Sequence, residues 1–319
     1  MAQQISDPGF GTKVGRTSGR IINRDGSINV RRVGDRFHVS DIYHFLLVAG
    51  WFNFILLVFG VYIAVNFVFA SLYIAIGTDQ LANSTVHGQQ SPYEIAFQFS
   101  TQTLTTLGYG NLAPRTSLVG AVAAFEALIG LLIFGIFTGV TYGRFARTKA
   151  RITFSRHAII APLRGESNAL MFRLVNERTS VVMDASANLL LVLAEPLKGQ
   201  ASRRFYNLPL ESPKINSLAL NWTLVHPITQ DSPLFGLPIK ELHTAQAEFL
   251  VTITAFDDTV RQTFYARTSY TAEQVVSGRK FEPMFWTTDQ GDVELHVEKV
   301  HDHVEAELLP EGPSPGSDT

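Results

Sequence analysis

The sequence of 319 residues contains no cysteine, which excludes disulfide bonds, thiolate metal sites and gating by thiol oxidation. It also lacks formal charge in two long stretches. No Asp, Glu, Lys or Arg lies between Asp41 and Asp79, and only Glu126 lies between Arg115 and Arg144. Since a helix needs about 20 apolar residues to cross a bilayer, we predict two membrane-spanning helices. The first apolar run is too long, and starts too late, for a cleaved signal peptide.

Other absences exclude further classes of protein. The net charge of −2 gives no reason to expect nucleic acid as a partner. Residues 144–319 contain no Gly-x-Gly-x-x-Gly turn, which argues against a nucleotide-binding domain after the second span. The sequence offers no nucleophile–base pair and no metal-ligand cluster. We therefore expect no enzymatic activity and no cofactor.

Basic residues are distributed unevenly around the two apolar stretches. The connecting segment, residues 77–115, has only Arg115. The flanks of the spans are much richer: Arg20, Arg24, Arg31, Arg32 and Arg36 precede the first, and Arg144, Arg147, Lys149, Arg151 and Arg156 follow the second. The positive-inside rule therefore predicts that both termini are cytoplasmic.

The connecting segment carries the string Thr105-Thr106-Leu107-Gly108-Tyr109-Gly110. Gly108 and Gly110 can adopt a positive φ without steric cost, so the backbone can alternate in handedness and turn successive carbonyl groups to one side. The string matches the TVGYG pattern of potassium-selective filters, with Leu107 in place of valine. Taken alone, Gly-Tyr-Gly is also an ordinary turn of a soluble protein.

The residues before this string favour a filter over a turn. Ser91 and Glu94 have the spacing of a capping box, and Pro92 suits a first helical position. The predicted helix, residues 92–103, is too short to span, and its C-terminal dipole would favour a cation. We predict a membrane pore with its filter at residues 106–110.

Taken as a whole, the sequence predicts four successive regions, with boundaries at residues 34, 150 and 300. Residues 1–34 are expected to be a flexible cytoplasmic segment, followed by either an interfacial helix at 35–43 or a frayed extension of the first span. The outer helix is expected at 44–76 and the inner helix at 117–143, within a membrane module of residues 35–150. Short β-rich runs predict a β-sandwich over 151–300, and residues 301–319 a disordered acidic tail.

Several strings, in order along the chain, resemble the inward rectifier potassium channels, and more closely their prokaryotic KirBac branch. They are Arg144-Phe145-Ala146-Arg147 through Phe154-Ser155-Arg156-His157-Ala158, Leu170-Met171-Phe172-Arg173, Trp222-Thr223-Leu224-Val225-His226-Pro227-Ile228 with Asp231-Ser232-Pro233-Leu234, Ala266-Arg267-Thr268-Ser269-Tyr270, and Phe281-Glu282-Pro283.

The resemblance implies an α+β membrane protein: a two-transmembrane-helix potassium-channel pore module with a pore helix, plus a cytoplasmic immunoglobulin-like β-sandwich. It further implies a homotetramer in the bacterial inner membrane that conducts K⁺ passively. A non-conducting membrane sensor, whose β-domain binds a partner, is the alternative. The complete filter string argues against a sensor.

The resemblance also implies roles for single residues in the filter. K⁺ would be coordinated by the carbonyl groups of Thr106, Leu107, Gly108 and Tyr109 and by the Thr106 hydroxyl, with Gly110 completing the segment. Gln102 and Leu112 stand where many eukaryotic members place a Glu–Arg ion pair, so the filter here needs another brace, in which we include Gln102.

On the second span, Glu126 either supports the filter by hydrogen bonding or faces an ion. Gly130 is either a hinge or a close-packing position. Phe134, Thr138 and Tyr142 share one helical face because they are spaced by four. Tyr142 is by resemblance the gate, and Phe134 would line a weakly rectifying pore. A lipid-facing aromatic belt is the alternative.

Two charged sets complete the predicted sites. By resemblance, Asp184 and Asp258 line the cytoplasmic pore, although either could be a solvated surface residue. The basic set at the inner membrane surface would attract anionic phospholipid at about 1 kcal/mol per charge, or would only set the topology. It consists of Arg36, Arg144, Arg147, Lys149 and Arg151.

Overall fold

The structure is a computed structural model that describes residues 3–14, 20–31, 33–34, 39–82, 91–146, 151–197 and 200–310. Three predicted lipid-binding residues, Arg36, Arg147 and Lys149, lie outside this part of the chain, as do residues 35–38 of the predicted interfacial helix and 311–319 of the predicted tail. The chain forms two compact units, Gly34–Arg147 and a second that joins Met1–Val33 to Thr148–Thr319. They are described separately.

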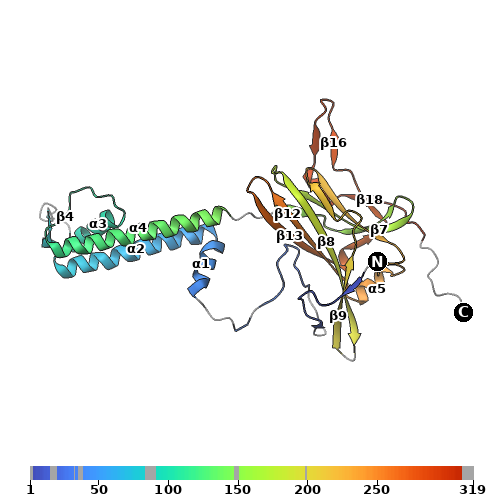
Figure 1. Cartoon of the computed structure of the whole chain (residues 1–319), viewed down its shortest axis with the longest axis horizontal. Helices are drawn as coiled ribbons and strands as arrows, with labels where there is room; N and C mark the ends of the chain where they lie inside the picture. Colours follow the sequence, from blue (N-terminus) through green and yellow to red (C-terminus); the bar gives the residue numbers. More distant parts are fainter. Residues whose placement is uncertain are drawn as a thin grey trace. The chain divides into compact units, whose positions relative to one another are not determined.

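The first unit contains the two helices that are long and apolar enough to cross a membrane, α2 (Trp51–Ile76) and α4 (Ser117–Phe145). Between them the chain forms η1 (Thr78–Gln80), β3 (Leu81–Ala82), α3 (Pro92–Leu104) and β4 (Ala113–Pro114). β3 and β4 pair antiparallel, and Figure 1 shows α3 beside the paired long helices. The predicted capping box of Ser91 and Glu94 is present at the start of α3.

The start of the first span differs from the prediction. Residues 44–48 belong to a separate helix, α1 (Val39–Val48), which lies at a steep angle to α2 in Figure 1, so the outer helix begins at Trp51 rather than at residue 44. Gly50 has ψ 153° and ends the helical path. Glycine weakens a helix, and the last carbonyl groups of α1 have other partners, described below. The hydropathy of the stretch between Asp41 and Asp79 did not predict this bend.

The second unit is a sandwich of two sheets. The larger has the order β1-β9-β8-β12-β13, with β10 also on β8 and β2 also on β9. Its strands are β1 (Gln3–Ile5), β2 (Lys13–Val14), β8 (Val182–Leu197), β9 (Gln200–Leu208), β10 (Lys214–Ser217), β12 (Glu248–Asp257) and β13 (Gln262–Thr271). The smaller has the order β11-β7-β6-β14 with β5 on β7: β5 (Ile152–Phe154), β6 (Ala158–Leu163), β7 (Ser167–Asn176), β11 (Asn221–Ile228) and β14 (Val275–Ser277).

Short elements complete the second unit. They are α5 (Ile239–Thr244), η3 (Ala272–Gln274), η4 (Val297–His301) and the two-stranded pairs β15 (Arg279–Phe281) with β18 (His303–Glu305) and β16 (Phe285–Thr287) with β17 (Val293–Leu295).

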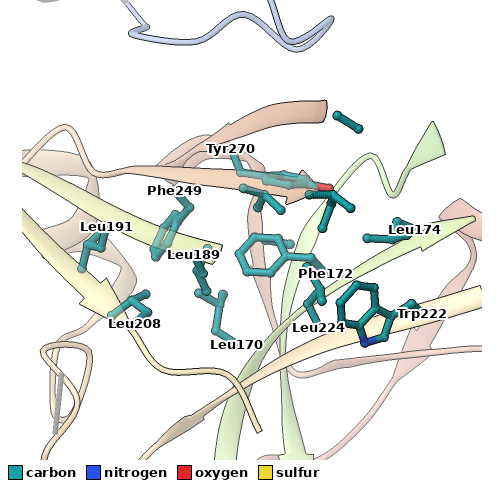
Figure 2. Packing of buried hydrophobic residues seen from close by; sticks show 14 of the residues in the cluster. Leu170, Phe172, Leu174, Leu189, Leu191, Leu208, Trp222, Leu224, Phe249 and Tyr270 are labelled. Carbon is teal, nitrogen blue, oxygen red and sulfur yellow. The ribbon is translucent and has the colours of Figure 1, made fainter. Parts of the chain in front are cut away.

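The core of the sandwich follows from strand periodicity. Alternate residues of a strand face the same side, and Leu170, Phe172 and Leu174 of β7 are all fully buried. Figure 2 shows them facing residues of β8, β12 and β13, including Leu189, Phe249 and Tyr270. Two apolar spans, a helix between them and a β-sandwich together confirm the predicted fold class.

The described parts of both terminal segments are more ordered than predicted. Residues 3–5 and 13–14, expected to be flexible, form β1 and β2 on the edge strand β9, and Ile21 and Ile22 are buried against the larger sheet. At the other end, β18 pairs with β15, and the Asn168 side chain bonds the main chain of Leu309. An open sheet edge offers unpaired donors and acceptors, so both segments are ordered by long-range pairing.

A pH dependence of stability follows from His226, which is buried in the sandwich. Its Nδ1 lies 2.7 Å from the Pro209 carbonyl oxygen and its Nε2 2.8 Å from the Ser232 hydroxyl oxygen. Burial lowers the pKa of His226 below its usual 6.5. The unfolded chain therefore takes up a proton at higher pH than the folded chain, and stability falls as the pH drops below about 6.5.

When the pH is lowered from 7 to 5, the thermal midpoint of the wild type should fall by about 3 °C more than that of His226→Gln. Thermal unfolding followed by tryptophan fluorescence measures this difference. His243→Gln, at an exposed histidine of α5, is the control and should keep the wild-type slope. Equal slopes for all three proteins would contradict the assignment to His226.

Candidate ion-conduction site

The segment after α3 has a backbone of alternating handedness. Thr106, Gly108 and Gly110 have φ values of 58°, 55° and 78°, whereas Leu107 and Tyr109 between them do not have positive φ. Its start is tied to the pore helix, since the amides of Leu107 and Gly108 donate to the Gln102 carbonyl oxygen at 2.9 and 3.3 Å. Such an alternation lets successive carbonyl groups point to one side, as the coordination of a dehydrated cation requires.

Gln102 and Leu112 lie on either side of this segment and are both buried. The Gln102 Oε1 atom has no hydrogen-bond partner within the described residues. Since Leu112 has no polar atom in its side chain, these two residues cannot form an ion pair. Within this part of the chain, the contribution of Gln102 to the filter comes through its main-chain carbonyl group.

Glu126 of α4 is the centre of a buried polar cluster. Its Oε2 accepts from the Tyr73 hydroxyl of α2 at 2.6 Å, and its Oε1 lies 2.5 Å from the Ser100 hydroxyl oxygen of α3. Ser100 also contacts Asn66 Oδ1 of α2 at 3.0 Å. The cluster thus joins all three helices behind the filter. Tyr73, Ser100 and Asn66 are absent from our sequence predictions, although polar residues within an apolar span are a usable signal.

Gly130 lies where α4 crosses the end of α3. A methyl group at this position would lie 2.1 Å from the Leu104 carbonyl oxygen and 3.0 Å from its carbonyl carbon. By contrast, methyl groups at Gly135 and Gly139 would meet no described residue within 4 Å apart from the neighbouring backbone of α4 itself. Of the two interpretations of Gly130, hinge or packing, the geometry favours packing.

The predicted pore face of α4 borders a cavity of about 760 Å³. Phe134 and Thr138 line it together with Thr105 and Thr106, so the base of the filter segment and this face of α4 share one space. The Thr138 hydroxyl donates to the Phe134 carbonyl oxygen. Tyr142, one turn further along, is not part of the lining and is largely exposed in the single chain.

Arg144 has contacts that our sequence analysis did not predict. Its guanidinium donates to the carbonyl oxygens of Leu46 and Ala49 at the end of α1. It also lies over the rings of Trp51 and Phe54, 4.7 and 4.6 Å from their centroids. Arg144 therefore caps α1 and holds the α1–α2 bend against α4. Arg151, by contrast, is exposed.

The two predicted cytoplasmic acids lie at one end of the larger sheet, because the start of β8 pairs with the end of β12. Asp184 has φ 48° beside an irregularity in this pairing, and its carboxylate lies 3.6 Å from Lys214 Nζ. Asp258 is exposed in the turn after β12. The fold brings these acids together, but neither is buried or strongly paired.

Two spanning helices, a capped shorter helix between them and a glycine-containing segment of alternating handedness define the class of two-span, pore-loop ion channels. Two family profiles match this chain: "Inward rectifier potassium channel C-terminal domain" over residues 152–314 and "Ion channel" over residues 55–147.

Individual relatives agree with these profiles. The chain is 35% identical over 286 residues to the inward rectifier potassium channel Kirbac3.1 of Paramagnetospirillum magnetotacticum, covering 89% of this chain and 95% of that one. It is 26% identical to the ATP-sensitive inward rectifier potassium channel 12 of Bos taurus, covering 85% and 68%. The chain belongs to the inward rectifier potassium channel family. This confirms the predicted family, whose members are ion channels and not enzymes.

Proposed function

We propose that four copies of this chain form a passive, potassium-selective channel in the bacterial inner membrane, with both termini in the cytoplasm. In each copy the carbonyl groups of Thr106, Leu107, Gly108 and Tyr109 and the Thr106 hydroxyl coordinate dehydrated K⁺. The observation that carries this proposal is the alternating handedness of residues 106–110, anchored on the Gln102 carbonyl group.

A tetramer is supported by what a single chain leaves incomplete. One copy supplies a single row of carbonyl groups, whereas replacing the hydration shell of an ion needs a ring of carbonyl groups around it. Several large apolar residues of α4 on and near the cavity are also exposed in one copy, including Leu131, Phe134 and Ile136. Neighbouring copies would cover part of this surface.

Further elements of the proposal concern gating, block and regulation. Tyr142 closes the pore at the crossing of the inner helices by excluding water. Asp184 and Asp258 line the cytoplasmic path, while apolar Phe134 gives weak block by polyamines within the membrane. Anionic phospholipid modulates gating through the basic residues that flank the membrane helices. Because Arg144 caps α1, this role falls mainly to Arg36, Arg147, Lys149 and Arg151.

Flux measurements test the function. Purified protein in liposomes should take up potassium or its analogue rubidium, barium should block the uptake, and sodium should not be conducted. Varying the fraction of anionic lipid should change the rate. Absence of flux in every lipid mixture, with an intact tetramer, would favour the alternative of a non-conducting sensor whose β-domain binds a partner.

The gate assignment gives a separate prediction. Tyr142→Ala should raise resting flux several-fold, because a wider constriction is hydrated more easily. Tyr142→Phe keeps the ring and should stay close to the wild type, which makes it the matched control. Liposome flux in one fixed lipid mixture is the measurement. Unchanged flux in Tyr142→Ala would place the constriction elsewhere.

A further inference from the structure

The polar cluster around Glu126 is closed within one chain. Asn66, Ser100 and Glu126 each have 0% of their surface exposed in the single copy, and Tyr73 has 1%. In this structure, neither bulk water nor a neighbouring copy of the chain can therefore contact these groups. Their hydrogen bonds must be satisfied among themselves and by the main chain, so donors and acceptors can be counted.

The count begins at Asn66. Its Nδ2 donates to the Tyr62 carbonyl oxygen at 2.8 Å, which leaves Oδ1 to face Ser100. The flipped amide would bring Oδ1 against the Tyr62 carbonyl oxygen, where two acceptors would repel each other. Asn66 therefore presents an acceptor to Ser100, and its main-chain carbonyl oxygen adds a second at 3.4 Å.

Ser100 has one hydroxyl hydrogen, but acceptors lie on both of its sides. Asn66 Oδ1 lies on one side and Glu126 Oε1 on the other, 2.5 Å away. If Glu126 were ionised, the single hydrogen could satisfy only one of them. If Glu126 Oε1 carries a proton, it donates to Ser100, Ser100 donates to Asn66, and the Tyr73 hydroxyl donates to Oε2. Every side-chain group then has a partner.

Charge leads to the same assignment. Among the residues that the structure describes, no basic side chain contacts this cluster, and between Arg115 and Arg144 the sequence has no Lys or Arg. An ionised carboxylate buried in a membrane span without a cationic partner is strongly unfavourable. A neutral carboxylic acid avoids this cost.

We infer that Glu126 is held as a neutral, protonated acid and acts as a hydrogen-bond donor that positions the pore helix. Ser100 receives this bond two residues before Gln102, whose carbonyl group holds the amides of Leu107 and Gly108. Glu126 is thus a positioning residue for the filter, acting through α3. This last step, from α3 to conduction, rests on the proposed function.

Infrared spectroscopy tests the protonation state without using conduction. The difference spectrum between the wild-type channel and Glu126→Gln at neutral pH should contain the C=O stretching band of a protonated carboxylic acid, which is well separated from carboxylate bands. Subtraction of the variant removes the other buried acids, such as Glu248 and Asp257. A difference spectrum with carboxylate bands only would overturn the inference.

Flux tests the positioning role. Glutamine is the isostere of the neutral acid, since its amide can donate to Ser100 and its oxygen can accept from Tyr73. Glu126→Gln should keep flux within about twofold of the wild type. Glu126→Leu removes the donor to Ser100 and leaves the Tyr73 hydroxyl without its acceptor, and should lower flux at least about tenfold. If Glu126→Gln fails as badly as Glu126→Leu, the neutral donor is not what the filter needs. Absence of flux in the wild type would contradict the proposed function. The infrared spectrum would still show whether Glu126 is protonated.

Discussion

Gly130→Ala is expected to abolish potassium flux and to weaken the assembled channel. The added methyl group would lie 2.1 Å from the Leu104 carbonyl oxygen, which belongs to the main chain of α3 and cannot rotate away. The two helices would have to separate by roughly 1 Å, and overpacking of this kind costs about 1–3 kcal/mol per site. Since α3 ends directly before the filter, the displacement would act on residues 106–110.

Gly135→Ala is the matched control. It makes the same change in the same helix, at a position where no described residue outside the neighbouring helix backbone would lie within 4 Å of the added methyl group. It should retain flux and a normal thermal midpoint. Both variants would be compared by liposome flux, potassium-over-sodium selectivity and thermal dissociation of the oligomer. A Gly130→Ala channel of normal selectivity and stability, but altered opening, would instead support the hinge interpretation.

Arg173→Leu is expected to destabilise the β-sandwich unit by more than about 3 kcal/mol. The Arg173 guanidinium is buried and donates to four main-chain carbonyl oxygens. These belong to Glu282, Lys299, Val300 and Asp302. It also lies 4.5 Å from the centroid of the Phe281 ring.

Burial lowers the pKa of Arg173 to about 10, so the group stays charged at neutral pH and binds these carbonyl groups as a cation. It connects β7 to the chain around β15, η4 and β18. Leucine would leave the carbonyl groups without donors, which should lower the thermal midpoint by about 10 °C and expose residues 279–305 to protease.

The control for this prediction is Arg178→Leu, which removes an exposed arginine just after the same strand. Arg173→Lys should recover part of the loss, because an ammonium restores the charge but not the planar set of five donors. Thermal unfolding by tryptophan fluorescence and limited proteolysis of the whole channel provide the measurements. Equal midpoints for Arg173→Leu and Arg178→Leu would show that the carbonyl cage contributes little.

The features that could be predicted are those encoded by neighbouring residues. The absence of charge over two stretches indicated α2 and α4, and the spacing of Ser91 and Glu94 indicated the cap of α3. Thr106 with positive φ could not be predicted, because a side chain disfavours this conformation. It is the surrounding structure, including the bonds from Leu107 and Gly108 to Gln102, that holds the segment in place.

Other features depend on residues far apart in the sequence. Nothing near residues 1–30 indicates that β1 and β2 will pair with β9, and nothing near Gly50 indicates that Arg144 will bind the end of α1. Likewise, Glu126 could be recognised as an unusual charge, but its partners Ser100 and Tyr73 lie 26 and 53 residues away. Such contacts form only when the fold brings the chain segments together.

The sequence by itself therefore indicated the two apolar helices and the glycine-containing segment 106–110, since hydropathy, capping and glycine freedom are local properties. The ordered strings along the chain indicated the family. Only the tertiary structure decided three other points: that Gly130 packs against Leu104, that Arg144 caps α1, and that Glu126 is enclosed by Ser100 and Tyr73. The physical reason is that steric exclusion and hydrogen-bond satisfaction depend on which atoms meet, and the order of residues does not contain this information locally.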